Sequence, residues 1–114
     1  MTMTNVFASV AVRDLGPAVA WYERIFGAPD ARPMSEVVEW YFPEGGALQV
    51  YAGPERAGQG SFTVAVTDID DQAAALEAAG VRSPEPSRGP QFETIMIKDP
   101  DGNSIAFAHP VAES

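Results

Sequence analysis

The chain has 114 residues, of which 46% are hydrophobic and 20% charged, so it has the length and composition of one globular domain. This composition excludes a disordered chain, and the sequence has no run of about 18 apolar residues that could form a transmembrane helix. The sequence contains no cysteine, which excludes disulfides, thiol catalysis and cysteine-bound metals. We expect a cytoplasmic protein, because the first residues also lack the basic and apolar regions of a signal peptide. The net charge of −9 argues against nucleic acid and anionic membranes as partners.

Two segments of the chain repeat each other. Residues 9–15 (SVAVRDL) and residues 63–69 (TVAVTDI) share four of seven residues and lie 54 positions apart, close to half the chain. In each copy a strand-like stretch leads to an aspartate, Asp14 or Asp68, and then into a helical pattern. The repeat predicts two similar units within a single domain of residues 1–114: module one over about residues 5–53 and module two over about residues 60–110.

Each module is predicted to contain one helix, over about residues 15–26 in module one and 69–79 in module two. Asp14 and Asp68 are the expected N-caps, and Gly27 is a natural stop for the first helix. The first helix carries an apolar stripe at helical spacing: Ala18, Trp21, Tyr22 and Ile25.

Each module also contains three longer strand candidates, over about residues 6–12, 36–42 and 47–52 in module one and 61–66, 92–98 and 104–109 in module two. A further short strand, near Ala31 or around Val81, completes the order βαβββ in each module. Residues 83–90 contain three prolines and are expected to form an exposed loop. The predicted fold class is therefore α+β, with two βαβββ modules in one chain.

Alternate residues of a strand share a face, and the aliphatic face of each predicted strand is expected to pack on the helices. The opposite face carries Ser9, Gln49 and Tyr51 in module one, and Thr63 and Ala106 in module two. These residues are mostly small and neutral, whereas a face turned to solvent usually carries charge. The pattern suggests a concave surface that closes on a ligand, on the other module or on a second chain.

Several features of the chain resemble one known superfamily. A strand ends at Asp14 and opens a helix that contains Trp21 and Tyr22, and the turn Asp-Pro-Asp-Gly-Asn at 99–103 precedes the last strand. In this order they resemble the vicinal oxygen chelate superfamily, which includes glyoxalase I, bleomycin-resistance proteins and extradiol dioxygenases. The resemblance spans nearly the whole chain. It implies mixed sheets that curve to form a cup with the helices outside, and it implies a homodimer.

Enzymes of this superfamily hold a divalent metal with His, Gln or Glu side chains that face the cup. The resemblance maps the four metal positions onto Phe7, Gln49, Ser61 and Ala106. Phenylalanine and alanine have no donor atom, serine is a poor ligand for a divalent ion, and one glutamine cannot make a site. We therefore expect no metal, no cofactor and no catalytic residues of this kind.

The residues expected to line the cup form the predicted ligand-binding surface: Phe7, Ser9, Trp40, Gln49, Tyr51, Ser61, Thr63 and Ala106. Aromatic walls with a few hydroxyls and one amide suit a planar, partly apolar ligand. Residues 36–42 contribute one of their two faces, and the sequence leaves both open: Val38, Trp40 and Phe42, or Glu39 and Tyr41.

Two carboxylates and the single histidine have roles that depend on their orientation. If Glu39 or Glu93 faces the cup, a cationic ligand is favoured through charge pairing or cation–π contact. His109 ends the last strand and shares a side with its aliphatic residues by alternation, so we expect a structural or surface role for it.

Three functions are compatible with these observations. The first is a protein similar to the bleomycin-resistance branch that binds a small aromatic or cationic molecule without catalysis. The second is a superfamily enzyme of lyase or dioxygenase type, or one that uses Glu39 or Glu93 in acid–base chemistry. The third is a dimeric scaffold whose cup is filled by its own side chains. The first best explains the missing metal donors and the acidic balance.

Overall fold

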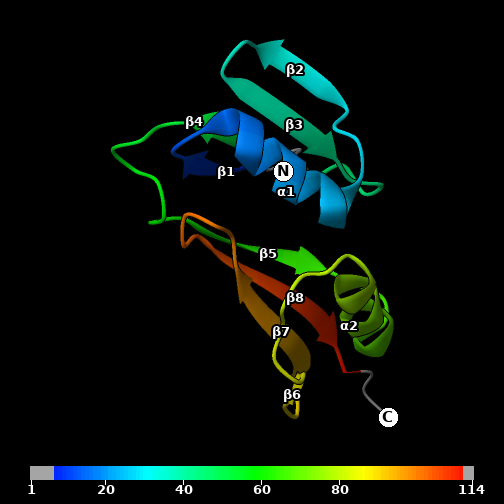
Figure 1. Ribbon diagram of the computed structural model, residues 1–114. Helices are drawn as coiled ribbons and strands as arrows, with labels where there is room; N and C mark the ends of the chain where they lie inside the picture. Colours follow the sequence, from blue (N-terminus) through cyan, green and yellow to red (C-terminus); the bar gives the residue numbers. More distant parts are fainter. Residues whose placement is uncertain (1–6, 112–114) are drawn as a thin grey trace.

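The computed structural model describes residues 7–111, without the side chain of Phe7. Module one contains, in chain order, β1 (Phe7–Val12), α1 (Leu15–Phe26), β2 (Ala31–Met34), β3 (Val37–Tyr41) and β4 (Ala47–Ala52). Module two contains β5 (Ser61–Ala65), α2 (Ile69–Ala78), β6 (Ser87–Arg88), β7 (Phe92–Lys98) and β8 (Ser104–Pro110). Both modules therefore have the order βαβββ (Figure 1).

Each module forms its own four-stranded mixed sheet. The strand order is β1-β4-β3-β2 in module one and β5-β8-β7-β6 in module two. In each sheet the first strand of the module runs parallel to the last, and the other neighbours are antiparallel. Helix α1 packs on the sheet of module one and α2 on that of module two. This confirms the α+β class with two βαβββ modules.

The side of each sheet that faces its helix forms the core. Leu48 and Val50 alternate with less buried residues along β4, and Ile105 and Phe107 do so along β8. A strand with a polar or small residue at every second position has only one apolar face. In each sheet this face is the one that the helix covers. The aliphatic faces predicted from alternation are confirmed.

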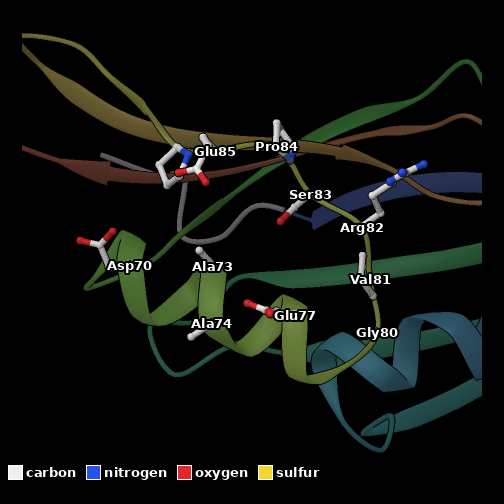
Figure 2. A pocket seen from close by; sticks show the side chains of 11 residues that line it. Asp70, Ala73, Ala74, Glu77, Gly80, Val81, Arg82, Ser83, Pro84 and Glu85 are labelled. Carbon is white, nitrogen blue, oxygen red and sulfur yellow. The ribbon is translucent and has the colours of Figure 1, made fainter.

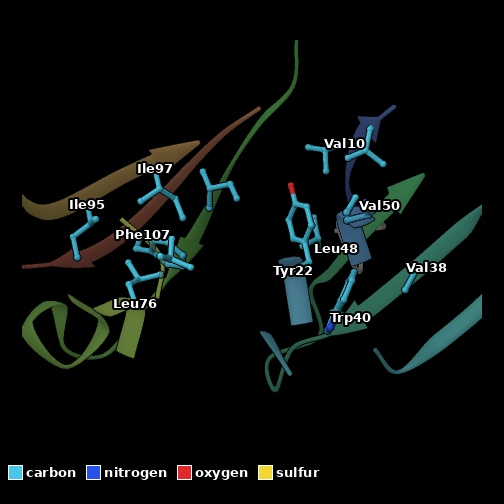
Figure 3. Packing of buried hydrophobic residues seen from close by; sticks show 14 of the residues in the cluster. Val10, Tyr22, Val38, Trp40, Leu48, Val50, Leu76, Ile95, Ile97 and Phe107 are labelled. Carbon is cyan, nitrogen blue, oxygen red and sulfur yellow. The ribbon is translucent and has the colours of Figure 1, made fainter. Parts of the chain in front are cut away.

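The two helix-facing sides meet inside the chain. Figure 3 shows the core side chains in two groups, one around Tyr22 and one around Leu76. Phe26 of α1 joins them, because its ring centroid lies 6.5 Å from the rings of both Phe62 and Phe107 in module two. The opposite face of each sheet is therefore not covered by the helices of the same chain. We call it the open face.

The two helices begin differently, although both start after an aspartate. Asp68 accepts a hydrogen bond from the N–H of Asp71 at 3.0 Å and so caps α2. Asp14 occupies the same place before α1, but its side chain makes no capping bond. The third residue of α1 is Pro17, which has no N–H to donate to such a cap. Gly27 ends α1 with a φ of 79°, as predicted.

The short strand of module two is not where the sequence indicated. Strand β6 lies at Ser87–Arg88, inside the expected loop, and not around Val81. Val81 is buried and its N–H donates to the carbonyl of Leu76, so it closes the end of α2. Proline cannot donate to a ladder, and the prolines at 84, 86 and 90 confine β6 to two residues. The short strand near Ala31 is confirmed as β2.

The turn at 99–103 connects the modules. The side-chain amide of Asn103 donates to the carbonyl of Ala11 in β1 at 2.8 Å, and its carbonyl accepts from the N–H of Gly60 at 2.8 Å. The buried carboxylate of Asp99 accepts from the hydroxyl of Tyr22 in α1 at 2.7 Å. The motif that carries the family resemblance therefore has a structural role, since it fixes module two against module one.

Within residues 7–111, no helix has both the length and the apolar character needed to cross a membrane.

Candidate functional site

A row of polar side chains crosses the open face of module one. Ser9 of β1 stands opposite Gln49 of β4, and Gln49 stands opposite Glu39 of β3. The Ser9 hydroxyl donates to the Gln49 carbonyl oxygen at 2.9 Å, and the Gln49 amide nitrogen donates to the Glu39 carboxylate. The Tyr41 hydroxyl donates to the other Glu39 oxygen at 2.8 Å. These four residues, the polar row, form one continuous hydrogen-bonded network.

The two ends of the polar row are exposed to solvent, whereas the carboxylate of Glu39 between them is buried. Tyr41 is 52% exposed and Ser9 is exposed, whereas only 8% of Glu39 is accessible. The hydrogen bond to Glu39, above all, raises the pKa of Tyr41 above its ordinary value of 10.0, so the hydroxyl, already a donor at neutral pH, keeps its proton into more alkaline solution. A ligand on this face meets the hydroxyl oxygens of Ser9 and Tyr41 first, with the carboxylate between and behind them.

The structure selects one of the two faces that the sequence left open for residues 36–42. Glu39 and Tyr41 lie on the open face with Gln49, and Val38 and Trp40 lie on the helix side. The signal that could have decided this is the tight turn at 43–46, where the N–H of Phe42 donates to the carbonyl of Gly46. This turn fixes the register of β3 on β4 and so places Glu39 opposite Gln49.

The prediction that Trp40 belongs to the ligand-binding surface is wrong. Its side chain is 2% exposed and packs against Tyr22 and Phe26 in the core, with ring centroids 5.9 and 6.3 Å apart. Its indole N–H donates to the carbonyl of Gly27 at 2.9 Å, so even its polar group is used internally. Trp40 therefore lies on the wrong side of the sheet to touch a ligand on the open face.

Tyr51 lies one row away from the polar row on the same face, opposite Ala11 of β1. Its ring covers Gly53 so closely that a Cβ there would lie 2.9 Å from a ring carbon, which leaves room for glycine alone unless the ring moves. Tyr51 also borders a hollow of about 330 Å³, which is completed by residues 53–56 and includes one acid, Glu55, and one base, Arg56. This volume is at the lower end of small-molecule sites.

The predicted site residues of module two lie together on the open face of their own sheet. Thr63 of β5 stands opposite Ala106 of β8, and Ser61 is two residues from Thr63 along the strand. Among the described residues, no side-chain hydrogen bond joins them to the polar row. The side chain of Phe7 lies outside the described part of the structure, although its backbone belongs to β1.

Glu93 and His109 are both engaged in module two. Glu93 forms an ion pair with Arg88 and stands opposite His109. By alternation along β7, Glu93 lies on the same side as the buried residues of this strand, which is the side away from the open face. A ring nitrogen of His109, Nδ1, lies 3.0 Å from the carbonyl oxygen of Val66. The expected structural role of His109 fits this contact, and Glu93 is not available to a ligand on the open face.

A second hollow has a different location and contains none of the predicted site residues. It measures about 580 Å³ and lies between α2 and the segment 80–86 (Figure 2). Its polar side chains include three carboxylates, of which Asp70 already pairs with Arg88 at 2.6 Å. We therefore regard the polar row, and not this hollow, as the candidate site.

Comparisons with known proteins agree with this fold. The sequence model of the glyoxalase-like domain family matches residues 6–108. The chain is similar to the crystal structure of a glyoxalase/bleomycin resistance protein from Catenulispora acidiphila, with 34% identity, a TM-score of 0.84, and coverage of 94% of this chain and 98% of that one. No curated protein sequence matches the chain.

Two more distant structures show the range of proteins built on this fold. TnmS3, an antibiotic binding protein from Streptomyces sp. CB03234, is 24% identical with a TM-score of 0.79, over 97% of this chain and 99% of that one. A lactoylglutathione lyase from Agrobacterium tumefaciens is 19% identical with a TM-score of 0.75, over 96% and 94%. The paired βαβββ modules are thus those of the vicinal oxygen chelate fold. The chain belongs to the glyoxalase/bleomycin resistance superfamily, within its glyoxalase-like domain family.

The residues present do not fit the metal that enzymes of this superfamily hold. Of the four mapped positions, only Gln49 and Ser61 have a side-chain oxygen, and the Gln49 oxygen already accepts from Ser9. Among the residues that the structure describes, no group of three or more His, Cys, Asp or Glu side chains could hold an ion. A catalytic metal generally needs three protein ligands of this kind.

Proposed function

We propose that this protein binds a small, planar, partly apolar molecule, aromatic or cationic, on the open face of module one and does not transform it. The observation that carries the proposal is the polar row beside Tyr51, where an uncovered sheet face combines an aromatic ring, two hydroxyls, an amide and a carboxylate. Such a face offers both apolar area and oriented polar groups, which is what small-molecule sites require. The antibiotic binding protein of Streptomyces supports the proposal to the extent that it shares the fold.

The internal repeat provides a comparison for the proposed binding role of the polar row. The positions of module two that correspond to Ser9, Gln49 and Glu39 are Thr63, Ala106 and Met96, because they occupy the same places in the strand register. Module two has the same fold without a polar row. The fold therefore does not require these side chains in module one, which favours a role in binding.

We further propose that the protein acts in the cytoplasm as a homodimer of single-domain chains. The open face of module two carries exposed apolar side chains, with Phe92 at 51% and Met96 at 58%. The radius of gyration is 14.5 Å, compared with about 13 Å for a compact domain of this length. A second copy of the chain that covers this face would bury these apolar side chains and give a more compact assembly.

A thermal-shift screen with planar aromatic compounds, followed by calorimetric titration of the compounds that stabilise the protein, tests the proposed function. Tyr51→Ala is expected to weaken binding by about tenfold, because it removes the aromatic ring beside the polar row. Gln91→Ala changes an exposed residue outside this face and is the matched control. Equal affinity in the Tyr51→Ala variant, or no stabilising compound at all, would contradict the proposal.

Metal analysis of protein purified without chelators provides a separate check. We expect much less than one divalent ion per chain, because the donor set does not fit. One tightly held ion per chain that is lost in Gln49→Ala would show a metal site at the polar row and overturn the proposal of binding without metal.

A further inference from the structure

We propose that the ligand presents a cationic nitrogen group with several N–H donors, an ammonium, amidinium or guanidinium, to the polar row. The row recognises it as a set of hydrogen-bond acceptors around one carboxylate that has no basic partner. This inference rests on the proposed function, because it names the chemical class of the molecule that the open face of module one takes.

The direction of every hydrogen bond in the row follows from Glu39. A carboxylate only accepts hydrogen bonds, so the groups facing it must be the Gln49 amide N–H and the Tyr41 hydroxyl. The Gln49 carbonyl oxygen then faces Ser9, and because a carbonyl cannot donate, the Ser9 hydroxyl must donate to it. The opposite orientation of the Gln49 amide would place two acceptor oxygens against each other.

This ordering determines what the row can offer to a ligand. The hydroxyl protons of Ser9 and Tyr41 are both used within the row, so their oxygens face outward as acceptors. Glu39 accepts two hydrogen bonds and a carboxylate has about four acceptor sites, so capacity remains there as well. A ligand that donates several N–H bonds fits this surface. A carboxylate or phosphate would find one remaining donor, the second N–H of the Gln49 amide, and would otherwise face acceptors and a carboxylate of its own charge.

The charge of Glu39 is not balanced by a basic side chain. Among the described residues, both ion pairs involve Arg88 in module two, so none neutralises Glu39. The charged group next to Tyr41 is another carboxylate, Asp30, which accepts from the Tyr41 backbone N–H at 2.7 Å. Arg56 and Glu55 border the hollow at Tyr51 and offset each other. A deep carboxylate held only by neutral donors gains most from a cationic partner.

The proposal is tested with three probes of the same size and ring but different charge: benzamidinium, benzamide and benzoate. Calorimetric titration at neutral pH and low salt is expected to show benzamidinium binding at least about tenfold more tightly than benzamide, and benzoate most weakly. Added salt should weaken benzamidinium binding and leave benzamide binding unchanged.

Two variants separate the charge from the shape of the site. Glu39→Gln keeps the size of the side chain and is expected to reduce the preference for benzamidinium to about twofold or less. Tyr41→Phe keeps the charge and removes one donor to Glu39, so the preference should persist or increase. Glu36→Gln, at an exposed carboxylate just before β3, is the matched control and should change nothing. Circular dichroism of each variant verifies that it is folded.

The outcomes distinguish this inference from the function on which it rests. If benzamide binds as tightly as benzamidinium and Tyr51→Ala weakens the binding of both, the cation preference is wrong and the proposed function stands. Loss of the preference in Tyr41→Phe would also overturn the inference, because recognition would then depend on the hydroxyl. If none of the three probes binds at this face, the proposed function and the inference both fail.

Discussion

Tyr22 illustrates how one residue stabilises both modules. Its side chain is fully buried, its ring lies 5.9 Å from that of Trp40, and its hydroxyl donates to Asp99 across the module boundary. Asp99 also accepts from the N–H groups of Asp101 and Asn103, so a charged group is kept in the interior by donors alone. A hydrogen bond to such a group contributes more than an average one.

Tyr22→Phe removes this hydrogen bond while preserving the ring. We expect a loss of about 2 kcal/mol in the free energy of unfolding at neutral pH, because Asp99 remains buried with one donor fewer. Urea denaturation of the two proteins measures the difference. A variant as stable as the parent would show that the Tyr22–Asp99 contact contributes nothing to the junction.

The same hydroxyl predicts how stability depends on pH. Burial, followed by the hydrogen bond to Asp99, raises the pKa of Tyr22 above its ordinary value of 10.0. Above pH 10 the unfolded chain loses this proton and the folded chain keeps it, so stability falls as the pH rises, by up to about 1.4 kcal/mol per pH unit from this group. The stability gap between the parent and Tyr22→Phe should therefore narrow between about pH 9 and 11. A constant gap over this range would contradict the raised pKa.

Residue types alone predicted part of the candidate site. Gln49, Ser9 and Tyr51 were identified from alternation along the strands, since a polar residue between two aliphatic ones can only face away from the helices. Trp40 was misplaced and Tyr41 left undecided, because both faces of residues 36–42 contain aromatic rings. Only the register between β3 and β4 distinguishes them, and register is a property of the paired strands.

At the scale of elements, the two helix starts make a paired prediction. Asp68→Ala is expected to cost about 1 kcal/mol of stability, because its carboxylate caps α2 through the N–H of Asp71. Asp14→Ala is expected to cost less than about 0.5 kcal/mol, because its side chain makes no capping bond. Thermal or chemical denaturation of both variants checks this, and equal losses would contradict the role assigned to Pro17.

The turn at 99–103 makes a second prediction at this scale. Asn103→Ala removes the inter-module bond to the carbonyl of Ala11 and the bond from the N–H of Gly60, at the start of module two. We expect a loss of about 3 kcal/mol, because the carbonyl of the buried Ala11 and the N–H of the partly buried Gly60 lose these partners. Gln59→Ala, at an exposed neighbouring position, serves as the control in the same denaturation series. A loss as small as that of the control would show that the turn does not hold the modules together.

The order of elements could be predicted well from the sequence, but the shortest strand could not. The internal repeat and the alternating apolar residues specify two helices and six longer strands, because burial imposes a period on the residue types. Strand β6 has two residues, both exposed, and forms because the chain returns alongside β7. Such a strand leaves no pattern of its own in the sequence.

For the whole molecule, the proposed homodimer predicts that the open face of module two is covered. Replacing both Phe92 and Met96 by aspartate should convert a dimer to a monomer, because two exposed apolar side chains of this face are exchanged for charged ones. Sedimentation velocity measures the mass, and Ala20→Asp, at an exposed position of α1, is the control. A monomeric parent protein, or a double variant that stays dimeric, would contradict the proposed interface.

An amide-resolved NMR titration of the intact protein with benzamidinium tests the central claim most directly, because it reports where the molecule binds. We predict that the largest shifts fall on Ser9, Gln49 and Tyr51 and on the residues of β3 that share their face. Shifts that cluster instead on α2 and residues 80–86, around the hollow that they line, would contradict the assignment of the site to the open face of module one.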